Sequence, residues 1–463
     1  MAHVSRLASL KRREFLKHAS ALSVAGTAAP WALQLAAINE AAAATASGDY
    51  KALVCLFMYG GNDYGNTLVP YDAASHAAYA TIRQTLATPR DQLAATALTP
   101  SVALPDGRQM ALAPTLSAVK PVFDAGRLAV MLNIGTLMQP TTLAQYKAQS
   151  VPLPPKLFSH NDQQSLWQSS KPEGAISGWG GRLGDRFLSG NGNATFTCIN
   201  VSGNAVFMSG GQAVQYQMGS SGAVAINGVT RSLFGSQACS EALRTLVTGE
   251  RTHWMETELN RVTSRSINAQ ATVSSALSSV NLTTPFDTTS SLASQLSMVA
   301  KLIAARSALG VARQVFFVSL GGFDLHDVLV DQHPKLLQQV GNAMASFDAA
   351  LQELGVANNV TTFTASDFGR TLTSNGDGSD HGWGSHHLVM GGAVKGGRFY
   401  GQLPSVSVNG PDDVGQGRLL PTTAVDQLAA TLALWMGVSA SDLPSVLPGI
   451  GNFSQPDLGF MAA

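Results

Sequence analysis

The chain has few charged residues. Of its 463 residues, only 13% are Asp, Glu, Lys or Arg, and 29 Lys+Arg balance 29 Asp+Glu. The first 46 residues hold five Lys/Arg and two Asp/Glu, which leaves 24 positive and 27 negative side chains, a net charge of −3, in the remainder. A surface that binds nucleic acid or an anionic membrane needs clustered positive charge. The composition therefore argues against nucleic acid as a partner.

Cysteine is scarce as well. The three cysteines form neither a CxxC pair nor a zinc-ribbon spacing. Cys55 lies within an apolar run and is predicted to be a buried free thiol. Cys198 and Cys239 could pair in an oxidising compartment, but the sequence does not show whether their Cα atoms come within bridging distance. Their pairing stays open.

Several functional motifs are missing. The sequence has no Walker loop, no GxGxxG fingerprint and no GxSxG nucleophile elbow, so nucleotide-binding, redox and serine-hydrolase functions are disfavoured. No run of residues is long and apolar enough for a stable membrane span. The Ala-rich segment from Ala19 to Ala37 is weakly apolar and is interrupted by Gly26 and Pro30.

The amino terminus resembles an export signal. Arg12 and Arg13 form a pair of arginines ahead of the Ala-rich segment, and Ala44-Thr45-Ala46 offers a small-x-small cleavage site before Ser47. This order predicts a twin-arginine signal peptide over residues 1 to 46, with the twin-arginine export machinery as a partner and a periplasmic or secreted mature protein. The alternative is a cytosolic amphipathic helix or a membrane anchor.

Four apolar runs predict the fold class. Each run ends in a turn rich in glycine or acidic residues, as expected of central parallel strands that are buried on both faces. Helix-like stretches lie between them, such as Pro334 to Leu354. The alternation predicts an α/β protein with a doubly wound, mostly parallel sheet. The four runs are Lys51 to Tyr59, Leu128 to Ile134, Gln314 to Leu320 and Val360 to Ala365.

The pattern is interrupted between about residues 190 and 310. Residues 192 to 230 suggest a loop-rich insertion with short strands. Residues 236 to 309 suggest a helical insertion, with helices over 241 to 259 and 292 to 309 and a solvated Ser/Thr-rich connector over 271 to 291. We expect both insertions to belong to one domain that spans residues 47 to 463.

The strongest chemical signal lies in two Gly-flanked segments. Asp324-Leu325-His326 follows the third apolar run, and His381, His386 and His387 follow Asp380 within a Gly-rich stretch. Neutral imidazole and ionised carboxylate are ligands that divalent metals prefer. Turns after parallel strands meet at the carboxyl edge of the sheet. We therefore expect a metal-assisted hydrolase site there; the alternative is a set of surface histidines bonded to backbone.

Three further residues follow predicted strands. Asp63 is a candidate metal ligand or, equally, an Asx turn or helix cap. Asp367 is a candidate ligand. Arg370 either binds an anionic substrate oxygen or neutralises Asp367 in a structural ion pair.

Ser159 and His160 begin a predicted helix. Ser159 is a candidate nucleophile, although helix capping is the better-supported role. His160 is a candidate ligand or acid/base group. His333, just before Pro334, is predicted to lie on the surface.

These segments together resemble one family. The chain is identified as a member of the domain-of-unknown-function 1501 family of exported bacterial proteins, and the match spans nearly the whole mature chain. The segments that carry the resemblance are the paired-arginine leader, Phe57 to Tyr71, Ser159 to Gln163, Gly178 to Arg182, Gly321 to His326, Ser366 to Arg370 and Asp380 to Gly382.

That family resembles the alkaline-phosphatase and sulfatase-like superfamily, which implies one or two divalent metals (zinc, manganese or calcium) and transfer of phosphoryl or sulfuryl groups. The resemblance places metal ligands at Asp63, Asp324, His326, Asp367 and His381. Phe368 stands where a ligand histidine usually follows Asp367. Either the site holds one metal, or His386 and His387 supply the missing ligand.

The sequence thus predicts an exported metal-dependent hydrolase of small anionic esters, in which Ser159 or water is the nucleophile. The alternative is a catalytically degenerate binding or assembly protein on the same scaffold.

Overall fold

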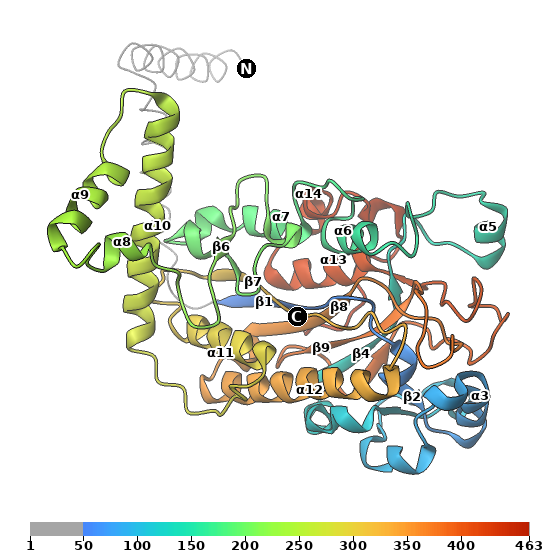
Figure 1. Cartoon of the computed structure of the whole chain (residues 1–463). Helices are drawn as coiled ribbons and strands as arrows, with labels where there is room; N and C mark the ends of the chain where they lie inside the picture. The colour runs from blue at the N-terminus through green and yellow to red at the C-terminus, as the bar shows by residue number, and fades with distance from the viewer. Residues whose placement is uncertain (1–49, 463) are drawn as a thin grey trace, which may run out of the picture.

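The computed structural model of the protein describes residues 50–462, and the predicted leader lies outside them (Figure 1). A nine-stranded sheet forms its centre, in the order β10-β4-β9-β8-β1-β7-β5-β6, with β11 also paired to β4. Its strands are β1 (Lys51–Met58), β4 (Leu128–Gly135), β5 (Cys198–Asn200), β6 (Tyr216–Gln217), β7 (Arg313–Leu320), β8 (Val360–Ser366), β9 (Ser385–Met390), β10 (Arg398–Tyr400) and β11 (Thr423–Ala424).

All pairs in this sheet are parallel except the two that β9 makes, with β4 and with β8. The four apolar runs form β1, β4, β7 and β8, so the prediction of a mostly parallel α/β sheet is confirmed. Because β9 runs the opposite way, its amino end lies at the edge where β1, β7 and β8 have their carboxyl ends. The loops at that edge hold the candidate site.

Helices cover both faces of the sheet (Figure 1). Along β1, Val54 and Leu56 face a core shared with α11 and α12, whereas Cys55 and Phe57 face a second core shared with α6, α7, α13 and α14. This alternation follows from the two-residue period of a strand. The helices are α3 (Ala73–Arg83), α4 (Lys120–Asp124), α5 (Leu143–Ala148), α6 (His160–Ser169), α7 (Trp179–Asp185), α8 (Asn227–Thr230), α9 (Gln237–Thr248), α10 (Trp254–Ser278), α11 (Ser291–Ala304), α12 (Leu329–Glu353), α13 (Val425–Met436) and α14 (Leu443–Val446). A separate hairpin pairs β2 (Leu68–Pro70) with β3 (Met110–Leu112).

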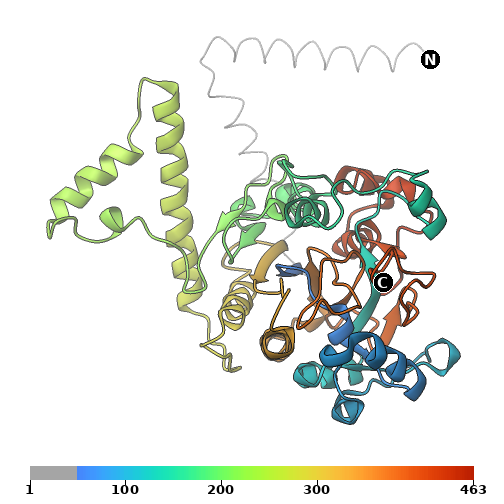
Figure 2. The ribbon, with the colours of Figure 1, turned by 45° about the vertical axis from the view of Figure 1, so that its right-hand side comes forward.

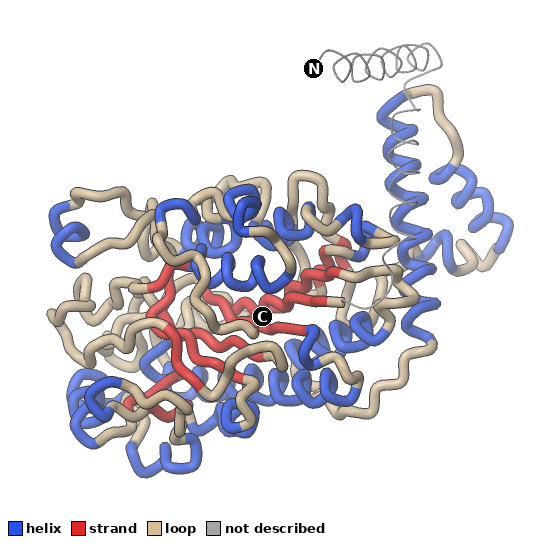
Figure 3. Tube along the Cα trace, turned by 180° about the vertical axis from the view of Figure 1, so that it is seen from behind, coloured by secondary structure: helices blue, strands red, loops and turns tan. Residues whose placement is uncertain are grey.

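Helices α8, α9 and the amino-terminal part of α10 project from the body as an arm (Figures 2 and 3). The sequence predicted one helix over 241 to 259, but the chain breaks at Gly249, which follows α9. Asn260 of α10 stabilises the turn between α9 and α10, because its side-chain amide donates to the carbonyl oxygens of Leu246 and Gly249. The predicted Ser/Thr connector is also shorter than expected, because α10 continues to Ser278.

Two details of α12 differ from the prediction. The helix begins at Leu329, five residues before the expected start at Pro334. The prediction that His333 lies on the surface is wrong: its side chain is buried, and its Nε2 lies 3.0 Å from Oδ1 of Asn62.

The cysteines are free: Cys55 and Cys198 are buried, and Cys239 is exposed. Among residues 50–462 no helix combines the length and the apolar character that a membrane crossing requires.

Candidate metal centre

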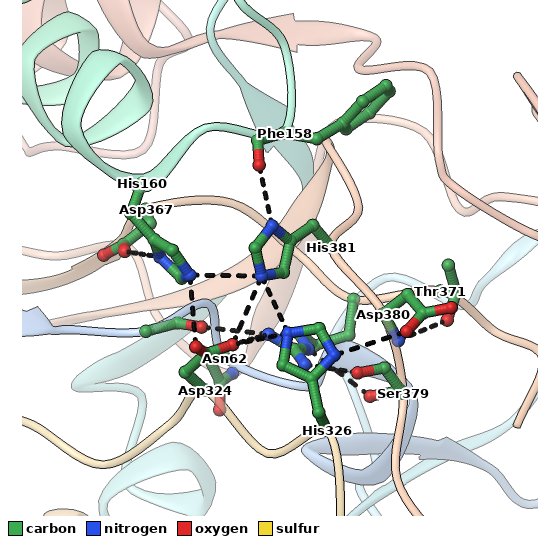
Figure 4. A network of polar contacts seen from close by, with 12 residues as sticks. Asn62, Phe158, His160, Asp324, His326, Asp367, Thr371, Ser379, Asp380 and His381 are labelled. Carbon is green, nitrogen blue, oxygen red and sulfur yellow. Dashed lines mark hydrogen bonds and ion pairs between the residues drawn. The ribbon is translucent and has the colours of Figure 1, made fainter. Parts of the chain in front are cut away.

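Four segments that are far apart in sequence meet at the carboxyl edge of the sheet (Figure 4). Asp324 and His326 follow β7, Asp367 follows β8, His381 precedes β9, and His160 is the first residue of α6. Such an edge is where α/β sheets bind ligands.

The side chains of His160, Asp324 and His381 offer ligand atoms that all lie within 4.8 Å of one another. Nε2 of His381 lies 3.1 Å from Nε2 of His160 and 3.3 Å from Oδ1 of Asp324. His326 borders the same group, with its Nε2 2.9 Å from Nε2 of His381 and 3.0 Å from Oδ1 of Asp324. Three imidazole nitrogens therefore approach one carboxylate.

The opposite ring nitrogen of each histidine is held by an oxygen. Nδ1 of His381 donates to the carbonyl oxygen of Phe158 at 2.7 Å. Because a carbonyl only accepts, Nδ1 carries the proton, and Nε2 of the neutral ring presents a lone pair to the cluster. Nδ1 of His160 lies 2.6 Å from Oδ2 of Asp367, a carboxylate that is almost wholly buried.

His326 is held in the same way, with its Nδ1 3.3 Å from Oδ1 of Asp380. Asp380 in turn accepts from the side-chain amide of Asn375 at 3.0 Å. Metal-binding histidines usually have such an outer acceptor, which fixes the tautomer and the orientation of the ring.

The local charges favour a neutral ring at the centre and an ionised carboxylate. Burial lowers the pKa of His381. Burial would raise the pKa of Asp324, but the hydrogen bond and charge of Arg370 outweigh it and hold that pKa below its usual value. The hydrogen bond to Asp367 raises the pKa of His160, so a proton on Nε2 of His160 would compete with a metal for the same position.

Arg370 holds the carboxylate of Asp324 in place. Its Nη1 donates to Oδ1 of Asp324 at 2.7 Å and to the carbonyl oxygen of Gly60 at 3.2 Å, while Nε and Nη2 donate to the hydroxyl and carbonyl oxygens of Ser379. The guanidinium is fully buried and all three of its nitrogens are engaged. The geometry favours a positioning role over contact with substrate.

Ser159 occupies the N-cap position of α6 without a capping hydrogen bond from its side chain. Instead its hydroxyl donates to Oδ2 of Asp162 at 2.9 Å. It therefore neighbours His160 in sequence and contacts a carboxylate.

Asp63 is not one of the residues that form the cluster. One oxygen caps the short helix that follows by accepting from the backbone of Gly65, and the other forms an ion pair with Arg83 of α3. Both side chains of this pair are buried. The helix-cap role that the sequence offered for Asp63 is thus observed, and Arg83 is a structural partner that the sequence spacing did not reveal.

His386 and His387 belong to strand β9 and not to a Gly-rich loop. Both are buried. Nδ1 of His386 accepts from the backbone of Asn133, and the ring of His387 packs edge-on against Trp167. The structure does not bring either ring to the cluster, because the run Ser385–Met390 alternates into the core on both faces of the sheet.

Three groups that hold the side chains of the site in place were not predicted from the sequence. The carbonyl of Phe158 has no signal, since any residue carries one. Asp380 stands beside His381, and that adjacency was a usable signal. Gln164, one turn into α6, donates to Oδ2 of Asp367 at 2.8 Å.

The donor set fits a borderline divalent metal. Such metals accept imidazole and carboxylate ligands together, and the oriented Nε2 lone pairs repel one another unless a cation or proton lies between them. His326 and Asp324 have side chains that are 45% and 44% exposed, so the cluster can be reached from solvent.

Comparison with known proteins identifies the family. The family model described as protein of unknown function (DUF1501) matches residues 50–445. No curated protein matches the chain.

Solved structures with a similar chain path include the PsFucS1 sulfatase from Pseudoalteromonas sp., with 9% identity, a TM-score of 0.37 and coverage of 88% of this chain and 73% of that one. Another is the lipoteichoic acid synthase LtaP from Listeria monocytogenes, with 8% identity, a TM-score of 0.34 and coverage of 88% and 78%. A third is the C-terminal periplasmic domain of EcEptC from Escherichia coli, with 12% identity, a TM-score of 0.31 and coverage of 86% and 85%. Likeness at this level says nothing about the activity of this chain.

Proposed function

The chain belongs to the DUF1501 family, and we propose that this member is an exported, metal-dependent hydrolase of phosphate or sulfate esters. The observation that carries the proposal is the convergence of His160, Asp324 and His381, with His326 beside them, at the carboxyl edge of the sheet. These four residues are the proposed ligands. Asp367, Asp380 and the carbonyl of Phe158 orient the histidine rings.

Zinc and manganese suit these donors better than calcium, which binds mainly through oxygen. A divalent metal held there would supply positive charge opposite the developing charge of an ester oxyanion.

Arg418 is the proposed contact for a substrate oxygen. Its Nε donates to the carbonyl of His381 at 2.6 Å, and its guanidinium lies 4.9 Å from the centre of the Phe158 ring. Within residues 50–462 no partner is found for its Nη2. The side chain is only partly buried, so this free N–H is available to an anionic ester beside the ligands.

The proposal leaves two candidates for the nucleophile. In the first, Oγ of Ser159 forms the bond to phosphorus or sulfur as the bond to the ester oxygen breaks, and Oδ2 of Asp162 takes the serine proton. The leaving alcohol takes a proton from water, and water then hydrolyses the serine ester to free phosphate or sulfate. The hydrogen bond between Ser159 and Asp162 supports this route. In the second, a water molecule attacks phosphorus or sulfur as the bond to the ester oxygen breaks, and the proton that the water loses passes to the leaving alcohol. Ser159 then only positions Asp162.

The test is metal content by elemental analysis, followed by turnover of 4-nitrophenyl phosphate and 4-nitrophenyl sulfate. We expect one to two equivalents of zinc or manganese in the wild type, near zero in His381→Ala, and no change in His253→Ala, which removes an exposed histidine at the amino end of α10. Turnover is expected to follow metal content. Ser159→Ala then separates the routes, because only the first loses turnover while retaining metal.

A wild-type protein that takes up neither metal would sink the mechanism. Bound metal without turnover of either ester would contradict the proposed hydrolase activity and support metal binding alone.

The paired arginines of the leader support export through the twin-arginine route. Replacing both Arg12 and Arg13 by Lys is expected to keep the precursor inside the cell, as fractionation would show. An unchanged distribution would contradict this route.

A further inference from the structure

Helix α10 carries a seam of mostly apolar residues with the spacing of a coiled coil. Successive members are four and three residues apart in alternation, which is the heptad pattern of two helices that pack along their length. The seam consists of Met255, Leu259, Val262, Ser266, Ala269, Val273 and Ala276.

Only half of this seam is covered. Ala269, Val273 and Ala276 are buried in the core that α11 and α12 share with the sheet. Toward the amino end, Met255 and Leu259 are 59% and 65% exposed. Val262 is 48% exposed, so the same stripe continues into solvent along the arm.

Helix α9 does not cover the exposed half. It packs near Asn260, whose buried amide bonds to the end of α9. On a helix with 3.6 residues per turn, Asn260 lies about 130° around the axis from the mean direction of the exposed seam. The seam therefore faces away from α9.

The charges beside the seam change sign along the helix. Glu258 lies toward the amino end and Arg265 toward the carboxyl end; both are exposed and both lie on the same flank of the seam, just before Leu259 and Ser266. Two such helices placed antiparallel bring the acidic end of each beside the basic end of the other. A parallel arrangement would set like charges together.

We propose that the exposed seam of α10 binds a second copy of this chain, as an antiparallel helix pair about a two-fold axis. The spacing sets Leu259 opposite Val262 of the second copy and Met255 opposite Ser266. On the flank that faces the same flank of the second copy, Glu258 then lies beside Arg265 of that copy, and the two-fold axis creates this ion pair twice. A symmetric contact of this kind closes at two copies.

The near-balance of charges favours a second copy over a lipid surface. Amphipathic helices that bind anionic lipid carry an excess of Lys and Arg on the polar face. Here two acidic side chains, Glu256 and Glu258, and one basic side chain, Arg265, flank the seam.

The experiment is sedimentation velocity on the purified chain between about 1 and 100 µM, because a seam of few layers predicts a weak dimer. We expect a concentration-dependent dimer for the wild type. Glu258→Arg and Arg265→Glu should each weaken it about 10-fold or more, since each creates two like-charged contacts. The double variant should restore it, while Arg244→Glu, a charge reversal on α9, leaves it unchanged.

Circular dichroism of each variant checks that the fold is retained. A wild type that stays monomeric at 100 µM would overturn the proposal. So would a double variant that dimerises no better than either single one, which would show a different contact. Binding of a monomeric wild type to phosphatidylglycerol vesicles would assign the seam to a membrane and also overturn it. None of these results depends on the metal or on ester turnover.

Discussion

The carbonyl oxygen of Phe158 accepts a hydrogen bond of 2.7 Å from Nδ1 of His381. Phe158 adopts a φ of 73°, which is rare for a bulky residue. Unfavourable backbone of this kind persists where the surroundings enforce it, and it is often found at functional sites. The backbone bend at Phe158 turns its carbonyl oxygen toward His381 and lies two residues before His160. One strained residue therefore helps to position two of the proposed ligands.

Asp367→Asn is expected to weaken metal binding about 10- to 100-fold, because it removes the carboxylate that orients His160 and leaves the ligands themselves intact. Titration with zinc against a competing chelator measures the effect. Glu173→Gln, an exposed carboxylate change in the loop after α6, is the matched control. An affinity equal to that of the wild type would show that Asp367 does not support the site.

Asp63→Asn is expected to lower the free energy of unfolding by about 3 kcal/mol while metal content stays at the wild-type value. The substitution leaves the buried guanidinium of Arg83 without its anion. Urea denaturation and elemental analysis of the same sample give both quantities. Loss of metal with unchanged stability would make Asp63 a ligand instead.

Gly60→Ala is expected to cost about 3 kcal/mol or more of stability and to reduce metal content. A Cβ at Gly60 would lie 2.3 Å from the backbone nitrogen of Asp324, and the φ of 116° is also unfavourable. Gly107→Ala is the control, since Gly107 has a φ of 67° but no atom within 4 Å of the added carbon. Its cost should be about 1 to 2 kcal/mol, from backbone strain. Equal losses in the two variants would exclude the contact with Asp324.

Stability is expected to fall as the pH drops below about 6.5. Burial lowers the pKa of His333 to about 4 and the pKa values of His386 and His387 to about 3. Between these values and the ordinary value near 6.5, the unfolded chain binds protons that the folded chain does not, so acid favours unfolding. Each histidine contributes a slope of about 1.4 kcal/mol per pH unit.

Urea midpoints of metal-free protein from pH 7.5 to 5 measure that slope. His333→Gln should reduce it by about one proton, and the exposed-site variant His253→Gln should not. Equal slopes in wild type and His333→Gln would contradict a neutral buried ring.

The strand core and part of the site could be predicted from the sequence. Long apolar runs ending in polar turns predict buried strands because only a central strand buries both faces, and this placed Asp324, His326 and Asp367 at one edge. Proximity along the chain also placed His381 near them. The Gly-rich stretch Asp380 to His387 suggests a loop, but its last three residues begin β9, where His386 and His387 are buried. The flanking glycines mask the start of a short buried strand.

Other features depend on partners that are distant in sequence. Arg83 reaches Asp63 only after α3 folds back, and Asn62 meets His333 across 271 residues. Local patterns do not encode such pairings, since many polar residues compete for them. Which residues are proposed ligands and which only orient the histidine rings depends on the orientation of those rings. The spacing of residues along the sequence does not determine it.

His160 and His381 meet although 221 positions separate them. A ribosome must therefore finish most of the polypeptide before both rings exist, and β9 must insert between β4 and β8 before they face each other. Under the proposed function, the metal can therefore bind only after β9 has joined the sheet. Nascent fragments that end before β9 should be unable to retain the ion.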